Sequence, residues 1–405
     1  MLAPAISARP AGRWPLDALN FFLADVAGGL GPYLAVYLLA VRHWNEARIG
    51  IVMSVAGIAG IVAQMPAGAL VDASRRKREL IAAAVLAVMA GTLALPAVDG
   101  FWPVAMAQAG VGAAGAVFGP AVAAISLGIV GHARFAARIG RNEAFNHAGN
   151  AVAAAIAGGI AYQFGPTAIF YLLAGLAIAT LTAVAAIPAV AIDHDVARGL
   201  VDGRRTADQP TGFSAIAADR HVLIFAVCVV LFHLANAAML PLVGQKLALR
   251  NENQGTAAMS LCILAAQLVM VPMALLVGRK ADSWGRKPLF LAGFLILTLR
   301  GALYPLSDNA GWLLGVQLLD GVGAGLFGAL FPLIVADLTW GTGRFNTVRG
   351  AIQAAQGVGA ALSTTLAGLI VVVHGYSAAF LTLAGIAAVG MMAFLILMPE
   401  TKDIR

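Results

Sequence analysis

Two ionisable residues lie deep inside long apolar stretches of the sequence. Asp25 follows Pro15 by ten residues, which is about 15 Å of helix, and His233 lies eleven residues past Val222. Burying such a group in hydrocarbon costs roughly 2.5 to 3.5 kcal/mol, so each needs a reason to be there. An imidazole titrates at about pH 6.5 when unperturbed and can exchange a proton with a carboxylate. The sequence therefore predicts a titrating pair, the alternative being that both residues support packing through hydrogen bonds.

Other polar side chains in the apolar stretches are candidates for binding a polar substrate. Glu143, His147 and Asn150 have i, i+4, i+7 spacing, which places them on one face of a helix that could line an inner vestibule. Isolated amides inside the apolar stretches serve equally well for substrate binding or for hydrogen bonds between helices. These amides are Asn20, Asn236, Gln267 and Gln356.

Arg300 and Asp320 lie at similar depths in two neighbouring apolar stretches, seven or eight residues from the same end. They are predicted to form a buried ion pair. Such a pair more often holds two helices in register than takes part in transport.

Metal and nucleotide chemistry have no sequence signature in this chain. Asp25, His233, Glu143 and His147 could in principle ligate a divalent ion, but no compact ligand spacing such as His-Glu-x-x-His occurs. A phosphate-binding Gly-x-x-x-x-Gly-Lys-Ser/Thr loop is also missing from the sequence, so ATP-driven pumping is not expected. Neither a metal nor a cofactor is predicted.

The elements that must position these residues are membrane-spanning helices. The chain is 60% apolar and 11% charged, with a mean hydropathy of +0.87, which leaves too little polar surface for a soluble globule. A span needs about 20 apolar residues. Twelve spans are predicted, at 15–41, 48–71, 79–98, 102–131, 143–163, 167–190, 222–249, 257–277, 288–307, 312–338, 350–372 and 377–398. The predicted fold is an all-α membrane protein.

An internal repeat divides these spans into two sets of six. At an offset of about 210 residues the segment 171–177 aligns with 381–387, and Asp72 aligns with Asp282. We therefore predict two pseudo-symmetric six-helix bundles, at 1–190 and 222–405, joined by a cytoplasmic linker at 191–221. A site for substrate is expected between the two bundles.

Basic residues indicate the orientation in the membrane. Most of the 26 Lys and Arg residues lie in the loops on one side, and the exceptions are Arg42, Arg48, Lys246, Arg250 and Arg300. Basic loops stay in the cytoplasm, so both termini are predicted to be cytoplasmic. The net charge of +7 then indicates basic loops that contact anionic lipid headgroups, and it does not indicate nucleic-acid binding.

The repeat contains two basic turns with one common pattern. The second turn reads Gly278-Arg-Lys-Ala-Asp282-Ser-Trp-Gly285-Arg286-Lys287, and the first keeps Gly68, Asp72, Arg76 and Lys77 but has Arg75 in place of the second glycine. The pattern resembles the loop signature of the major facilitator superfamily, which implies a monomeric secondary transporter of a small molecule in the bacterial inner membrane. Asp72 and Asp282 are then expected to form ion pairs that hold a gate closed, with positive-inside anchoring as the alternative.

Direction and substrate are less well indicated. Proton-driven antiporters of this superfamily usually carry an arginine where this chain has Met106, and the fifth span lacks their Gly-Pro step. We expect proton-coupled export of a small organic molecule. The alternatives are a symporter or uniporter that imports a metabolite, and a membrane sensor or enzyme that does not transport.

Overall fold

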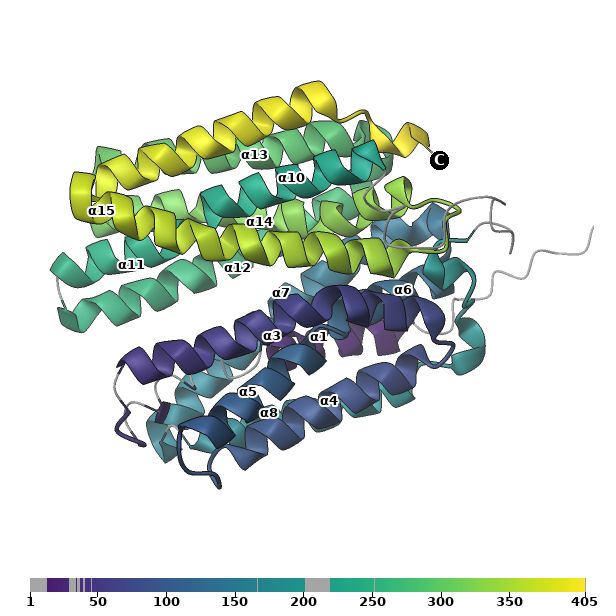
Figure 1. The fold of residues 1–405 in the computed structure, drawn as a ribbon, viewed down its shortest axis with the longest axis horizontal. Coiled ribbons are helices and arrows are strands. Elements are labelled where there is room, and N and C mark those ends of the chain that lie inside the picture. Colours follow the sequence, from purple (N-terminus) through teal and green to yellow (C-terminus); the bar gives the residue numbers. More distant parts are fainter. Residues whose placement is uncertain are drawn as a thin grey trace, which may run out of the picture.

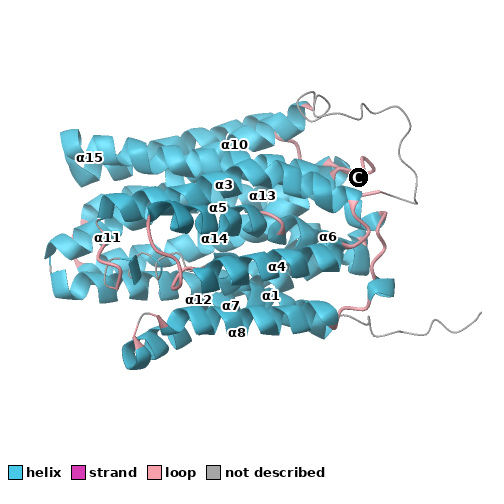
Figure 2. Cartoon of the chain, turned by 60° about the horizontal axis from the view of Figure 1, so that its bottom comes forward, coloured by secondary structure: helices cyan, strands magenta, loops and turns pink. Residues whose placement is uncertain are grey.

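A computed structural model describes residues 13–28, 34, 37–38, 41–44, 46–165, 167–200, 219–250 and 252–404. This part of the chain contains helices and no strand, and the long helices run roughly parallel or antiparallel to one another (Figures 1 and 2). Each of the twelve predicted spans has a helix in the structure. The helices fall into two bundles that follow the two halves of the sequence (Figure 1).

The N-terminal bundle contains six spans, one of them interrupted. Its helices are α1 (Arg13–Gly28), α3 (Glu46–Ala73), α4 (Lys77–Ala94), α5 (Phe101–Gly115), α6 (Phe118–Val130), α7 (Phe135–Phe164) and α8 (Ala168–Ala185). The fourth predicted span is divided into α5 and α6. Pro120 explains the interruption, because it has no N–H for a helical bond and its ring collides with the preceding turn.

The C-terminal bundle has the same kind of organisation. Its helices are α10 (Arg220–Asn236), α11 (Met239–Arg250), α12 (Glu252–Trp284), α13 (Arg286–Leu303), α14 (Ala310–Leu338) and α15 (Phe345–Leu397). The seventh span divides into α10 and α11 ahead of Pro241. Gly375 has φ 81°, which a glycine adopts without strain, and it separates the eleventh and twelfth spans within α15.

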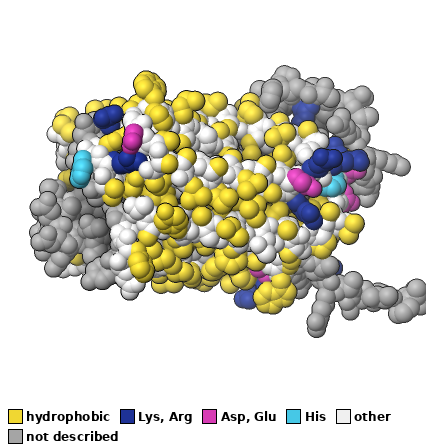
Figure 3. Space-filling view, turned by 90° about the horizontal axis from the view of Figure 1, so that it is seen from below, with side chains coloured by type: hydrophobic (Ala, Val, Ile, Leu, Met, Phe, Trp, Pro, Cys, Tyr) yellow, Lys and Arg dark blue, Asp and Glu magenta, His cyan; other side chains and the backbone are white. Residues whose placement is uncertain are grey.

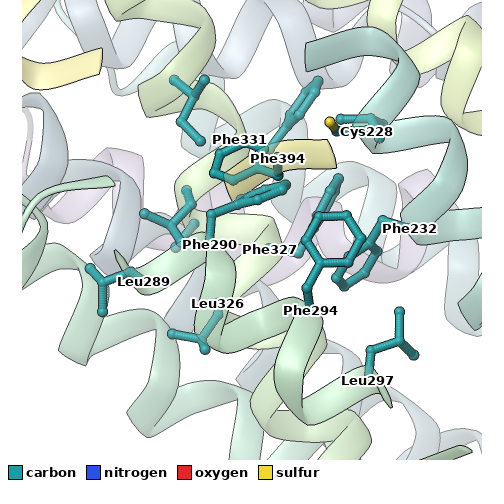
Figure 4. Packing of buried hydrophobic residues seen from close by; sticks show 14 of the residues in the cluster. Cys228, Phe232, Leu289, Phe290, Phe294, Leu297, Leu326, Phe327, Phe331 and Phe394 are labelled. Atoms are coloured by element: carbon teal, nitrogen blue, oxygen red, sulfur yellow. The ribbon is translucent and has the colours of Figure 1, made fainter. Parts of the chain in front are cut away.

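Each bundle has an apolar core of its own. One core is built from residues between Leu16 and Ala197, and the other mainly from residues between Val222 and Met398. Aromatic rings dominate the second core, where Phe232, Phe290 and Phe327 lie in contact (Figure 4). Cys228 and Cys262 are buried and carry no disulfide, as expected for thiols inside spans.

The outer surface of the helices is apolar and the charges gather at the two ends (Figure 3). Eight segments of the described chain are long and apolar enough to cross a membrane, counting α15 once. We call the end that carries residues 74–76, 339–344 and the C-terminus the basic end. The other end carries residues 41–44 and Ser307 to Asn309 and is called the opposite end.

Several helices begin earlier than the sequence predicts, among them two that begin with turns that contain arginines. The helix of the fifth span, α7, starts at Phe135 rather than residue 143, and α15 starts at Phe345 rather than residue 350. These first turns contain charged residues, so they lie outside the apolar runs from which the spans were predicted. Arg138, Arg141 and Arg349 consequently lie on helices and not in loops.

Candidate transport site and gate

The two bundles meet along two pairs of helices. Helix α3 packs against α15, and α7 packs against α12. A Cβ added at Gly350 would lie 2.9 Å from the carbonyl carbon of Gln64, so the α3 and α15 backbones are in direct contact there. On the other pair, His147 Nδ1 lies 2.8 Å from Gln267 Oε1. The predicted polar residues on α7 and α12 therefore join the bundles to each other.

A cavity of about 120 Å³ lies between the bundles, and two charged side chains line it. Glu143 comes from α7 in the N-terminal bundle, and Arg349 comes from α15 in the C-terminal bundle. The Glu143 carboxylate also faces α14, where a Cβ on Gly328 would lie 3.5 Å from Oε2. Opposite charges from opposite bundles thus line the same cavity.

Arg349 is held by backbone rather than by a carboxylate. Its guanidinium donates to the carbonyl oxygen of Gly119 at the start of α6, while its Nε has no hydrogen-bond partner. A Cβ at Gly119 would lie 3.4 Å from Arg349 and 3.5 Å from the amide of Gln353, so a glycine gives both side chains room. Only 9% of Arg349 is exposed. An unused donor on a buried cation is suited to a polar or anionic ligand.

Two of the predicted amide-bearing positions lie close to this cavity. Asn20 lines it and donates to the carbonyl of Leu16 at 2.7 Å. Asn150 donates to Asn146, another lining residue, over 3.3 Å. Glu143, His147 and Asn150 thus share the helix face that their spacing predicts, and that face looks toward the other bundle.

Asp25 and His233 make no hydrogen bond or ion pair with each other in the structure. His233 Nδ1 lies 3.1 Å from the carbonyl of Val229 on its own helix, and its ring packs edge-on against Phe327 at 4.7 Å. Asp25 is half-buried and has no hydrogen bond or ion pair to another described residue. A matching depth in two spans did not bring the predicted pair together, because depth does not set the direction in which a helix face points.

The predicted ion pair between Arg300 and Asp320 is present and belongs to a larger network inside the C-terminal bundle. Asn236 accepts from Arg300 at 2.6 Å, which places this amide away from the cavity between the bundles. Tyr304 and Gln317 complete the network, since Tyr304 donates to Gln317 at 2.5 Å and Gln317 donates to Asp320 at 2.8 Å. Gln356 is half-buried on α15 and has no hydrogen bond to another described residue.

Asp72, in the first basic turn, reaches across to the other bundle. Its carboxylate accepts from the backbone and side chain of Thr347 at 2.8 and 2.7 Å. It also accepts from the side chain of Asn346 at 2.8 Å and from its backbone at 3.3 Å. These amides are the free donors of the first turn of α15, where a negative charge is favourable. The contact is a helix cap between bundles, not the ion pair predicted.

The second basic turn works inside one bundle. Asp282 pairs with Arg286 at 2.8 Å, one helical turn away, and its side chain is 54% exposed. Arg286 is buried and pairs with the fully buried Asp337 of α14 at 2.9 Å. Glu400 accepts from the backbone N–H of Arg286 and of Lys287 at 2.9 and 3.0 Å. In this conformation Asp282 therefore makes no contact with the other bundle that could serve the predicted gating role.

The remaining residues of the first turn support the Asp72 contact. A Cβ at Gly68 would overlap the carbonyl of Asn346, so glycine lets α3 and α15 approach. Lys77 is almost fully buried and donates to the carbonyl of Ser74 at 2.6 Å. Burial lowers the pKa of Lys77 to about 8, and the charge of Asp72 opposes only part of that shift. Arg76 is exposed at the start of α4.

Further contacts close the basic end around Asp72. The His132 and Trp340 rings lie 4.0 Å apart, and Phe135 meets Phe345 edge-on at 5.8 Å. The beginning of the predicted linker also takes part, because Gly341 donates to the carbonyl of Gly199 at 2.9 Å. The bundles are thus locked together at this end in the described conformation. Residues 201–218 of the linker lie outside the described residues.

No group of three or more His, Cys, Asp or Glu residues is placed to hold a metal ion within the described ranges. The polar side chains that line the cavity are instead amides, one glutamate and one arginine. Such a site can bind a polar solute and exchange a proton.

The sequence as a whole matches the Major Facilitator Superfamily, over residues 17–359 and 248–404. The chain belongs to this superfamily, whose members are transporters and not enzymes. A transporter of Mycobacterium tuberculosis, described as an uncharacterised member of the superfamily, is 55% identical over 404 residues, covering 100% of this chain and 97% of its own. Citrate exporter 1 of Aspergillus niger is 26% identical over 149 residues, which is 36% of this chain and 28% of the exporter.

Two solved structures have the same fold. The transporter FucP in an outward conformation superimposes with a TM-score of 0.75, covering 95% of this chain and 98% of FucP, at 13% identity. The human organic anion transporter MFSD10 superimposes with a TM-score of 0.65, covering 94% and 96%, at 14% identity. The predicted all-α fold of twelve helices in two bundles is therefore confirmed.

Arg349, the cationic residue of the cavity, was not identified from the sequence. Its position one residue before the predicted start of the eleventh span at most suggested a loop anchor for lipid headgroups. The available signal was the run from Phe345 to Ile352, which puts an arginine between small and apolar residues at helical spacing. Asp17 lies inside the first predicted span, two residues past its predicted start, and was not singled out there.

Proposed function

We propose that this protein is a proton-coupled secondary transporter that exports a small organic anion by alternating access. The observation that carries the proposal is the cavity between the bundles, where Glu143 and Arg349 approach from opposite sides. A buried carboxylate beside a cation can alternate between a charged partner and a protonated, neutral group. In the proposed exchange, Arg349 binds the anionic substrate in one half of the cycle, and Glu143 carries a proton in the opposite direction in the other half.

Arg349 supports an anion as the substrate class. It is the charged lining residue with an unused donor, and the other polar lining groups are neutral amides such as Asn20 and Asn146. The names of two similar proteins, a citrate exporter and an organic anion transporter, agree with this assignment. Their similarity to this chain is low, and Arg349 is the stronger support for an anionic substrate.

Alternating access requires that the basic end open and close. We assign closure to the cap that Asp72 places on α15, together with the ring contacts beside it. In the proposed orientation the basic end and both termini face the cytoplasm of a bacterial plasma membrane, and the protein works as a monomer. The described conformation is then closed toward the cytoplasm.

Asp25 remains a second proposed proton carrier, because it is half-buried in α1 without a hydrogen-bond partner among the described residues. His233 is proposed as a packing residue, since its imidazole is occupied by the Val229 carbonyl and by Phe327.

Proton flux in proteoliposomes tests the proposal. Purified protein is reconstituted with an internal pH dye and challenged with citrate and other organic acids, lipophilic cations, amino acids and sugars. We expect an organic acid to move protons in the opposite direction to itself. Glu143→Gln should reduce that flux at least tenfold, because the amide cannot carry a proton, and Asp25→Asn measures the contribution of the second carboxyl.

Glu79→Gln is the control, since Glu79 is an exposed carboxyl at the start of α4. Equal proton flux in Glu143→Gln and wild type would remove Glu143 from the coupling mechanism. Substrate and protons moving in the same direction would replace export by symport, and substrate movement without protons would indicate a uniporter. A response to cations alone would overturn the substrate class.

A further inference from the structure

A second and larger pocket opens at the basic end, away from the cavity that holds Glu143. It has a volume of about 520 Å³ and lies between α1 and α7 of one bundle and α12 of the other. Four arginines line it: Arg134, Arg138, Arg141 and Arg279. The pocket is thus a concentration of positive charge at a seam between the bundles.

Only one carboxylate balances these four guanidinium groups. Asp17 is almost completely buried and pairs with Arg138 at 2.6 Å and with Arg141 at 2.7 Å. Asp17 lies behind the pocket wall, and the described lining residues include no acidic side chain. Arg134 and Arg279 are exposed and have no hydrogen bond or ion pair to another described residue. The pocket therefore has an excess of positive charge and two guanidinium groups available for an anion.

The buried part of the pocket is rigid. Arg138 is 5% exposed and is fixed from both sides, since it donates to Asp17 and, over 2.6 Å, to Asn142. Asn142 in turn donates to Ser126 at 2.8 Å. The wall that this network holds in place gives a ligand a fixed surface.

The rest of the lining is apolar. Ile129 and Leu275 are half-buried and contribute aliphatic surface, and Trp14 is 78% exposed at the start of α1. Tryptophan favours the boundary between lipid and water because its ring is amphipathic. A free inorganic anion would use the arginines but would gain nothing from this apolar surface.

We infer that the pocket binds the headgroup of an anionic phospholipid, with the phosphate between the arginines of the two bundles and the glycerol region against Trp14 and Ile129. Arg141 approaches the phosphate from α7, Arg134 from the short turn before α7, and Arg279 from α12. Basic pockets between membrane helices are suited to such headgroups.

A lipid in this position would affect closure of the basic end. Gly140 and Gly278 lie directly beside the arginines, and a Cβ on Gly140 would be 2.6 Å from the Cα of Gly278. Bringing α7 and α12 so close also brings Arg141 and Arg279 toward each other. A phosphate between them offsets this repulsion, so the bound lipid stabilises contact between the bundles at this end.

Native mass spectrometry of the full-length protein in detergent tests the inference. Phosphatidylglycerol, phosphatidylcholine and inorganic phosphate are added separately to wild type and to Arg134→Gln/Arg279→Gln. Wild type should retain phosphatidylglycerol in preference to phosphatidylcholine, and the double variant should bind it roughly tenfold more weakly. Both arginines are exposed, so the double variant should fold.

Arg75→Gln/Arg220→Gln is the charge-matched control, because these two exposed arginines also belong to the basic end but do not line the pocket. The control should bind phosphatidylglycerol as wild type does. An equal loss in both double variants would overturn the inference, since it would show general surface attraction. Equal binding of both lipids would also overturn it, as would inorganic phosphate that displaces phosphatidylglycerol at equal concentration.

Discussion

The two basic turns, 68–77 and 278–287, share one sequence pattern and occupy equivalent places in the two bundles, yet their aspartates have different partners. Asp72 caps the first turn of α15 in the other bundle, while Asp282 pairs with Arg286 in its own. The turn that departs from the superfamily pattern thus makes the contact between bundles. The turn that keeps the complete pattern stabilises one bundle.

The difference follows from what surrounds each aspartate. Asp72 lies opposite a helix start whose N–H groups are free, and the backbone of Gly68 permits close approach. Asp282 is exposed, and the helix start nearest to it, that of α13, is capped by Glu400. Similar residues therefore serve different purposes because their neighbours are not symmetric.

The largest effect is expected when Asp337 is removed from behind the second turn. Asp337→Ala leaves the buried Arg286 with the exposed Asp282 and the Ala281 carbonyl as partners, and should lower the free energy of unfolding by about 3 to 5 kcal/mol. Thermal unfolding of the purified protein in detergent measures this. Asp282→Ala is the control and should cost about 1 kcal/mol or less, because its ion pair is solvated. Equal losses would mean that the second turn does not depend on its buried partner.

A smaller but more local effect is expected from Asp72→Ala. The substitution removes the carboxylate that accepts hydrogen bonds from Asn346 and Thr347. One hydrogen bond to a charged group contributes about 1.5 to 3 kcal/mol. Hydrogen exchange of the first turn of α15 should become at least tenfold faster, and the basic end should open more often. Asp282→Ala should leave this exchange unchanged. If both substitutions accelerate it alike, the two turns are equivalent gates and the comparison fails.

The smallest effect concerns the turn geometry. Gly285 has φ 95°, and a Cβ there would also overlap the carboxylate of Glu400, so Gly285→Ala should destabilise by about 1 to 2 kcal/mol or more. Arg75, its counterpart, has a negative φ and is exposed in a break of three residues, Ser74 to Arg76, so Arg75→Ala should be nearly neutral. Chemical unfolding of both variants measures the difference. A neutral Gly285→Ala would show that the tight second turn can relax.

Much of the fold could be predicted from sequence, because a membrane helix is specified by a local property, the length of an apolar run. The twelve spans and the boundary near Gly375 are examples. Helix starts rich in charge were misplaced for the same reason, and two of them carry Arg138 and Arg349. The interruptions before Pro120 and Pro241 were visible as prolines but not interpreted as breaks.

Less of the site could be predicted. The spacing of Glu143, His147 and Asn150 identified one face of α7 correctly, and the depth of Arg300 and Asp320 predicted their ion pair. Depth alone also suggested that Asp25 and His233 would meet, and they form no hydrogen bond or ion pair with each other. Residues at equal depth can point in any direction around their helices, so depth is necessary for contact but does not ensure it.

The sequence by itself determined the class of protein, the number of spans and the repeat that relates the bundles, since hydrophobic length, charge bias and local motifs are written along the chain. Only the tertiary structure decided which polar residues share a cavity, which aspartate joins the bundles and which arginines gather at the seam. These contacts depend on the rotation and approach of helices that are hundreds of residues apart, as Asp72 and Asn346 are. Packing, rather than periodicity, sets that rotation.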